Sequence, residues 1–188
     1  MSVALRRPMT IEEFLAWEEG QELRWEFDGL SPVAMTGGTA GHSRIQRNIV
    51  TALTVRLRGS PCEAYISDLK VRVADSIRYP DAFAGCSPVP SSATVVTDPV
   101  VVFEVLSDST ARTDHFVKNQ EYRDTRSIQR YVMLEQDSMG ATVFARVGDD
   151  WVGHVLGADA VLDMPEIGIS VPLVELYDGV DFSAADQA

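Results

Sequence analysis

The chain has 188 residues, of which 45% are hydrophobic and 23% are charged, proportions that are ordinary for a globular protein. This length predicts a single domain over residues 1–188, with a core from about residue 10 to 179 and short disordered ends. No apolar run reaches the roughly 18 residues of a membrane span, and no apolar stretch follows the basic N-terminus as it would in a secretory signal. We therefore expect a cytoplasmic protein without a membrane segment.

The formal net charge is −12, which by itself argues against a nucleic-acid partner. The charge is unevenly distributed, however. Residues 41–73 contain six basic and two acidic side chains, whereas residues 135–188 contain eleven acidic side chains and one basic side chain. A locally basic surface in the first of these regions is therefore compatible with the overall charge.

Cysteine usage gives no sign of a metal site. Cys62 and Cys86 are the two cysteines of the chain, and neither has a Cys or His beside it. In a reducing cytoplasm such residues are usually buried free thiols, and we expect that state here.

The N-terminal third predicts a helix followed by a hairpin. Thr10-Ile11-Glu12-Glu13 is a capping box, so a helix should begin here and end at Gly20. Two alternating runs, residues 22–27 and 30–35, flank Asp28-Gly29, which is a strong signal for a β-hairpin. In the first run the alternation places Glu26 on the polar, solvated face.

The longest helix is expected over residues 42–58, with Gly59 as its end. Its apolar residues recur on one face; they are Ile45, Ile49, Leu53 and Leu57. The opposite face is basic; it carries Arg44, Arg47 and Arg58. That face is by default solvated, and a role in following a DNA backbone is the alternative. His42 projects toward the apolar side at the start of this helix, where a histidine is usually a capping or core residue.

The rest of the chain indicates a mixed α/β fold around one sheet. Pro80 interrupts an apolar run and marks a strand start, an edge or a bulge. A helix to about residue 125 should follow Asp114, which we interpret as its cap, and Tyr122 should pack on this helix below Lys118. The other expected strands and the last helical turn are residues 62–66, 69–73, 77–84, 99–107, 130–134, 141–145, 151–156, 168–171 and 172–177.

The run Pro99–Ser107 predicts a strand that is buried on both faces. Glu104 is the one ionisable side chain within it. An isolated buried carboxylate would cost many kcal/mol, so Glu104 must be paired, protonated or bound to a cation. The plain alternative to a functional role is a buried ion pair with a lysine or arginine.

Two strand carboxylates, Asp81 and Glu104, could converge if their strands are neighbours. Carboxylate oxygens suit a hard cation such as Mg²⁺, which keeps several waters and takes one or two protein carboxylates. Such a cation can activate water and neutralise charge on a scissile phosphate. Lys118, on the following helix, could supply a positive charge there. The plain alternatives are a turn role for Asp81 and a simple ion pair between Glu104 and Lys118.

Several short motifs together resemble the signature of the Uma-two family, restriction-endonuclease-like proteins of the PD-(D/E)XK nuclease superfamily. The resemblance runs from about Thr10 to Gly179. Its motifs are Trp25–Gly29, His42, Ser67–Leu69, Tyr79–Asp81, Glu104–Ser107, Ser109-Thr110, Asp114, Lys118, Tyr122, Pro172-Leu173 and Leu176-Tyr177. It implies an α/β (α+β) fold with a mixed central sheet flanked by helices, an N-terminal hairpin and C-terminal β additions. It also implies Mg²⁺- or Mn²⁺-dependent hydrolysis of DNA, for which a homodimer is a reasonable arrangement.

The resemblance also implies roles for individual residues. Asp81 and Glu104 are similar to the two metal-binding acids of the superfamily, and Glu26 and His42 would support them. The superfamily lysine usually follows the second acid by two positions, where this chain has Leu106. Lys118 resembles a migrated substitute, as in the Uma-two pattern itself.

Two other function classes stay open from the sequence. The first is a catalytically inactive, nuclease-like binding or assembly module, in which the C-terminal strands could form a dimer; the net charge of −12 favours it. The second is a two-carboxylate glycosidase. The lysine beside the acids and the lack of an aromatic cluster near them argue against the glycosidase.

Overall fold

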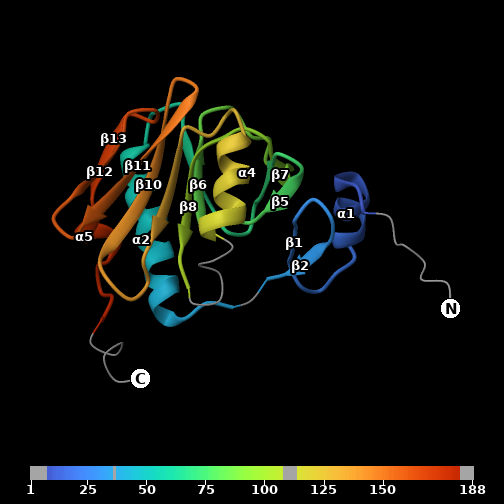
Figure 1. Ribbon diagram of the computed structural model, residues 1–188, viewed down its shortest axis with the longest axis horizontal. Coiled ribbons are helices and arrows are strands. Elements are labelled where there is room, and N and C mark those ends of the chain that lie inside the picture. The colour runs from blue at the N-terminus through green and yellow to red at the C-terminus, as the bar shows by residue number, and fades with distance from the viewer. Residues whose placement is uncertain (1–7, 36, 108–113, 183–188) are drawn as a thin grey trace.

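The computed structural model describes residues 8–35, 37–107 and 114–182. The predicted disordered tail and the Ser109-Thr110 motif lie outside these ranges, and the side chain of Asp114 is also not described. The described residues form three sheets, one of which is the two-stranded sheet β12-β13. The two larger sheets lie side by side, with α4 (Asn119–Asp124) in front of one and α2 (Ala40–Arg56) behind it (Figure 1). No helix among the described residues is long and apolar enough to cross a membrane.

The larger sheet has six strands in the order β11-β10-β9-β8-β6-β3. The β8–β9 pair is parallel and the other four pairs are antiparallel. The parallel pair is possible because α4 crosses over between its two strands. In chain order the strands are β3 (Glu63–Ile66), β6 (Ala82–Gly85), β8 (Pro99–Val105), β9 (Arg130–Leu134), β10 (Gly140–Val147) and β11 (Asp150–Gly157).

Strand β8 lies inside this sheet and is buried on both faces, as the sequence predicted. Its residues Val101, Phe103 and Val105 pack in a core with the apolar face of α2. Val102 points the other way and packs in a second core with Tyr122 of α4. Helices therefore cover both faces of the strand, which explains why its sequence is an almost unbroken apolar run.

The smaller sheet has five strands in the order β2-β1-β5-β4-β7. Helix α1 (Ile11–Glu18) covers it, and their core contains Ile11, Phe14, Phe27 and Ile77. The strands are β1 (Trp25–Phe27), β2 (Pro32–Ala34), β4 (Lys70–Val73), β5 (Ser76–Arg78) and β7 (Val95–Val96).

The expectation of one sheet is therefore wrong, although the mixed α/β class is confirmed. The run predicted over residues 77–84 is divided at Pro80, so that β5 belongs to the smaller sheet and β6 to the larger one. Proline has no N–H to donate to a ladder and here marks a strand start. The chain passes from one sheet to the other at this point.

Most other elements match their predictions. Thr10 and Glu13 form the capping box of α1, and β1 and β2 form the hairpin. The helix expected to follow Asp114 is a π-helical turn, η1 (Asp114–Lys118), that continues into α4. The C-terminal additions include one strand that the sequence did not predict, β12; they are β12 (Val161–Met164), β13 (Ile169–Pro172) and α5 (Leu173–Leu176).

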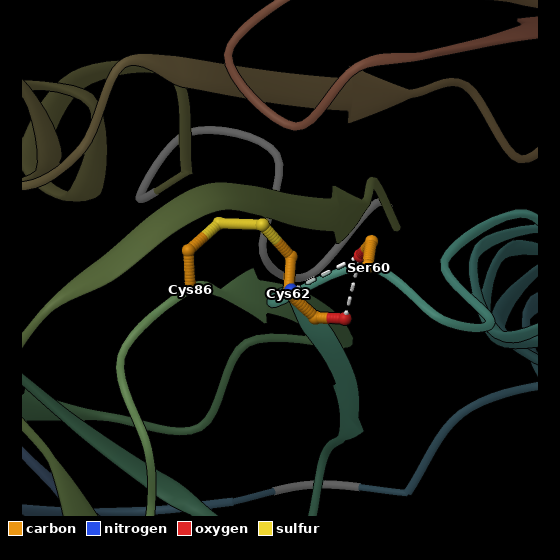
Figure 2. Close-up of a disulfide and its surroundings, with 3 residues drawn as sticks. All are labelled: Ser60, Cys62 and Cys86. Atoms are coloured by element: carbon orange, nitrogen blue, oxygen red, sulfur yellow. Dashed lines mark hydrogen bonds between the residues drawn. A yellow bond between two sulfur atoms is a disulfide. The ribbon is translucent and has the colours of Figure 1, made fainter.

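The prediction of free thiols is wrong, because Cys62 and Cys86 form a disulfide (Figure 2). Strands β3 and β6 pair in the register Glu63↔Gly85, so the two cysteines stand opposite each other one step beyond the pair. Ser60 Oγ accepts from the Cys62 N–H at 3.0 Å and donates to its carbonyl at 3.2 Å. A separation of 24 residues in the sequence gave no sign of this neighbourhood.

Candidate active site

The candidate residues meet at one end of the larger sheet. Strand β8 ends at Val105 and its antiparallel neighbour β6 begins at Ala82. The register Ala82↔Phe103 extends by one step to Asp81 opposite Glu104. The N-terminus of α2 is at the same end, because His42 in its first turn contacts Asp81.

Asp81 lies at the rim of the sheet and is held by three groups. Its Oδ2 accepts a hydrogen bond from the backbone N–H of Val105 at 2.6 Å. Its Oδ1 accepts from Gln46 Nε2 at 3.2 Å, and His42 Nε2 lies 3.3 Å from Oδ2. The carboxylate therefore binds a backbone N–H, as expected from the structural alternative to a metal-binding role for Asp81. Its side chain nevertheless retains 13% exposure to solvent.

Glu104 is deeply buried, with 4% of its surface exposed. Its Oε1 accepts from Lys118 Nζ at 3.0 Å and from the Tyr122 hydroxyl at 2.7 Å. Burial raises the pKa of Tyr122, and the nearby Glu104 charge raises it further, so this hydroxyl remains a donor. Of the three states expected for Glu104 (paired, protonated or bound to a cation), the structure shows the paired one, with Lys118. Tyr122 is buried as expected, but it also holds the carboxylate.

Glu26 is buried, so its assignment to a solvated strand face is wrong. Its Oε1 lies 3.5 Å from Lys118 Nζ and accepts from the Tyr79 N–H at 3.0 Å. Its Oε2 accepts from Arg78 at 3.1 Å. Burial alone would raise the pKa of Glu26, but the positive charges of Lys118 and Arg78 outweigh it and hold the pKa below its usual value.

Arg78 and Glu121 were not among the site residues predicted from the sequence. Arg78 is 2% exposed and donates two hydrogen bonds to Glu121, each of 2.7 Å, as well as the bond to Glu26. Burial would lower the pKa of Arg78, but these two carboxylates raise it. A signal was present, since Arg78 interrupts the apolar run Ile77–Tyr79 and Glu121 follows Lys118 by one helical turn. We define the buried ionic cluster as Glu26, Arg78, Glu104, Lys118 and Glu121.

The predicted site residues thus form two groups. Lys118 joins Glu26 and Glu104 within the buried ionic cluster, which α4 approaches. Asp81 and His42 form a rim group with Gln46 of α2, the helix on the other side of the larger sheet from α4 (Figure 1). The groups touch through the backbone of β8, since the Val105 N–H that binds Asp81 directly follows Glu104. In the described part of the chain, no three or more His, Cys, Asp or Glu side chains are grouped so that they could hold a metal ion.

Comparisons with known proteins agree with this architecture. A crystal structure described as "a putative nuclease belonging to DUF820" from Anabaena variabilis superposes with a TM-score of 0.76, over 91% of this chain and 98% of that chain. Sequence identity to it is 18%, so the likeness shows a shared fold.

Two relatives come from Synechocystis sp., and both are described as uncharacterized. Protein slr1290 is 32% identical over 175 residues, which cover 91% of this chain and 92% of the relative. Protein sll1609 is 28% identical over 170 residues, which cover 87% of this chain and 96% of that relative. The family model Uma2, described as "Putative restriction endonuclease", matches residues 11–173. This match spans most of the sequence, and the chain belongs to the Uma2 (Uma-two) family.

Proposed function

We propose that the protein is a nuclease that hydrolyses phosphodiester bonds of DNA with a divalent cation, Mg²⁺ or Mn²⁺, held by Asp81 and Glu104. The observation that carries this proposal is the position of these carboxylates at one end of the larger sheet, where Asp81 directly precedes β6 and Glu104 lies on the neighbouring strand β8, with the Lys118 ammonium bound to Glu104. Membership of a family described as "Putative restriction endonuclease" supports it.

The donor set fits a hard cation. Mg²⁺ binds oxygen ligands and often takes only one or two carboxylates, with water at its other positions. The buried ionic cluster holds three carboxylates against two cations, and Asp81 adds a further carboxylate beside it. A divalent cation would offset this excess of negative charge. When bound, it would supply an activated water and stabilise charge on the phosphate.

The other residues would position these groups. Lys118 is fixed between Glu104 and Glu26, and its ammonium would attract the negative charge that develops on the scissile phosphate. His42 and Gln46 hold Asp81, and Tyr122 holds Glu104. The positive end of the α2 dipole lies at the same end of the sheet and favours a phosphate there.

Affinity for DNA would come from the exposed face of α2. Its exposed arginines include Arg44, one turn into the helix, and Arg47, one turn further. They supply positive charge near the rim group in a protein whose net charge is −12. Binding through them should weaken steeply with salt.

The test is a cleavage assay on plasmid DNA with Mg²⁺ or Mn²⁺ and with a chelator in their place. We expect Glu104→Gln and Asp81→Asn to lower the metal-dependent rate by about 100-fold or more, the scale for loss of one preorganised electrostatic group. Glu12→Gln removes an exposed carboxylate on α1 and should leave the rate unchanged. Unchanged cleavage in Glu104→Gln, with the fold intact, would contradict the proposal.

The competing function is an inactive binding or assembly module built on the same fold. Because Lys118 already neutralises Glu104, such a module should take up neither Mg²⁺ nor Mn²⁺ in a calorimetric titration. Metal uptake that is lost in Asp81→Asn favours the nuclease. A homodimer would be a reasonable arrangement for cutting both strands of a duplex, and light scattering would give the mass of the assembly.

A further inference from the structure

A groove of about 770 Å³ lies beside α4, on the surface between this helix and strands β10 and β11. Its lining includes three aromatic side chains and several polar ones; among them are Phe116, Asn119, Gln120, Arg123, Phe144 and Trp151. None of these residues belongs to the proposed hydrolytic site. Asn119 nevertheless directly follows Lys118, so one helical segment contributes to both places.

Asn119 is the first reason to expect a ligand in the groove. It is 7% exposed and lines the groove. Among the described residues, the fully buried side-chain atoms without a hydrogen-bond partner are Ser127 Oγ and Gln136 Oε1, so the Asn119 carboxamide is not sealed in the core and is accessible from the groove. A carboxamide offers a donor and an acceptor side by side, so its natural partner is a planar group with the complementary pair.

The aromatic side chains supply flat surfaces for such a group. Phe116 is 72% exposed although it is large and apolar. The guanidinium of Arg146 lies 4.5 Å from the centre of the Trp151 ring. Arg123 lies 5.9 Å from the ring centres of both Phe144 and Trp151. Phe144 and Trp151 are half-buried, so Phe116 is the most open of the three rings. Aromatic rings and guanidinium planes are the surfaces on which unpaired bases stack.

The charges of the groove argue for recognition of a base rather than of phosphates. Arg146 donates to three backbone carbonyls, those of Ile128, Arg123 and Thr125, which fix its plane. Asp124 and Asp149 also line the groove, so two arginines face two carboxylates and the lining has no net charge. A ligand held mainly through its phosphates would need a clear excess of positive charge.

We propose that this groove binds an unpaired nucleobase of single-stranded DNA, which stacks on Phe116 or Trp151 while its edge pairs with Asn119. Bases in a duplex are already stacked and paired, so an unpaired base enters with the smallest cost. The inference rests on the proposed function for its class of ligand, since a nuclease must meet DNA. It adds a preference for substrate with a single-stranded segment.

The experiment measures binding in a chelating buffer, where metal-dependent hydrolysis cannot occur. A single-stranded 12-nucleotide DNA is titrated into the protein, and tryptophan fluorescence is followed. A second oligonucleotide of the same length and charge carries abasic sites. We expect the base-containing DNA to bind more tightly by roughly 5- to 150-fold, the range for stacking of one base. Trp151→Phe should remove the fluorescence change.

Two variants locate the binding. Phe116→Ala and Asn119→Leu should each weaken binding of the base-containing DNA by roughly 5-fold or more and leave binding of the abasic DNA unchanged. Phe116 is exposed, so its removal spares the core. Leu30→Ala is the matched control, because it removes another exposed large apolar side chain, on the β1–β2 hairpin.

Equal affinity for the two oligonucleotides, tighter binding of duplex than of single strands, or full binding by both groove variants would overturn the inference. Its failure is distinct from failure of the nuclease proposal. Binding that depends on bases in a protein without cleavage would defeat the nuclease proposal alone. Cleavage without any dependence on Phe116 and Asn119 would defeat the groove alone.

Discussion

The two carboxylates of the candidate site lie next to each other in the sheet but in contrasting surroundings. Glu104 belongs to the buried ionic cluster, where its partners are the Lys118 ammonium and a tyrosine hydroxyl. Asp81 belongs to the rim group, where its partners are a backbone N–H, the Gln46 amide and His42. One acid is thus surrounded by compensating charge and the other by dipoles and a titratable ring.

This difference suggests separate roles: the buried ionic cluster stabilises the fold, and the rim group is accessible to water and ligands. A buried charge that loses its partner costs several kcal/mol, so the cluster must remain complete for the chain to fold. A carboxylate at a partly exposed rim can exchange water and ligands at much lower cost. We infer that changes in the cluster affect folding most and that changes in the rim group affect ligand binding most. The following predictions test this division.

Loss of Arg78 should have the largest effect on stability. Arg78→Met removes the cation that Glu26 and Glu121 share and leaves both carboxylates in a buried region. We expect the free energy of unfolding to fall by about 3–5 kcal/mol, measured by urea denaturation. The control Arg58→Met changes an exposed arginine and should cost less than about 0.5 kcal/mol. A loss below about 1 kcal/mol for Arg78→Met would show that the cluster is not essential to folding.

The disulfide should make the next largest contribution. It closes a loop of 24 residues, for which the entropy of the unfolded chain gives about 3 kcal/mol. We expect Cys62→Ser/Cys86→Ser to lose this amount of stability. Cys86 follows the end of β6, whereas Asp81 precedes its start, so metal uptake at the rim should not change. Equal unfolding curves for oxidised and reduced protein would contradict this prediction.

The sequence predicted the fold well wherever a local pattern determines the structure. The capping box at Thr10, the hairpin and the apolar face of α2 depend on neighbours within a few residues. The partition into two sheets was missed, because it depends on where the chain turns at Pro80. The disulfide was missed for the same reason, since it depends on the pairing of β3 with β6.

The candidate site was predicted in part. A buried charge in an apolar strand signals a partner, and Lys118 is that partner for Glu104. The sequence could not show that Glu26, from a hairpin in the other sheet, reaches the same lysine. Alternation along the strand places Glu26 and Phe27 on opposite faces of the hairpin. The face that carries Glu26 is buried only because the two larger sheets pack together, which the local pattern does not show. The Arg78–Glu121 pair was missed because it also joins separate elements.

The pH dependence of stability should come from the cluster. The pKa of Glu26 is lower in the folded protein than in the unfolded chain, because Lys118 and Arg78 outweigh its burial. Its contribution is therefore fully present above the unfolded pKa of about 4.3 and is lost as the pH falls through the folded pKa. Urea unfolding between pH 7 and pH 3 should show this loss, and Glu26→Gln should reduce it. If the free energy of unfolding falls equally with pH in the unmodified protein and in Glu26→Gln, the loss of stability comes from other carboxylates.

The smallest effect on stability, with a large effect on function, is expected from Asp81→Asn. The substituted side chain keeps an oxygen that can accept from the Val105 N–H and loses the negative charge beside His42. Because the residue is at the rim, the free energy of unfolding should change by less than about 1 kcal/mol. Calorimetric uptake of Mn²⁺ should nevertheless be abolished. If this variant unfolds as readily as Arg78→Met, Asp81 is a structural residue and the division between cluster and rim fails. If it is stable and still binds Mn²⁺, Asp81 is not a ligand of the cation, and the ligands should then be sought among Glu104 and the other carboxylates of the buried ionic cluster.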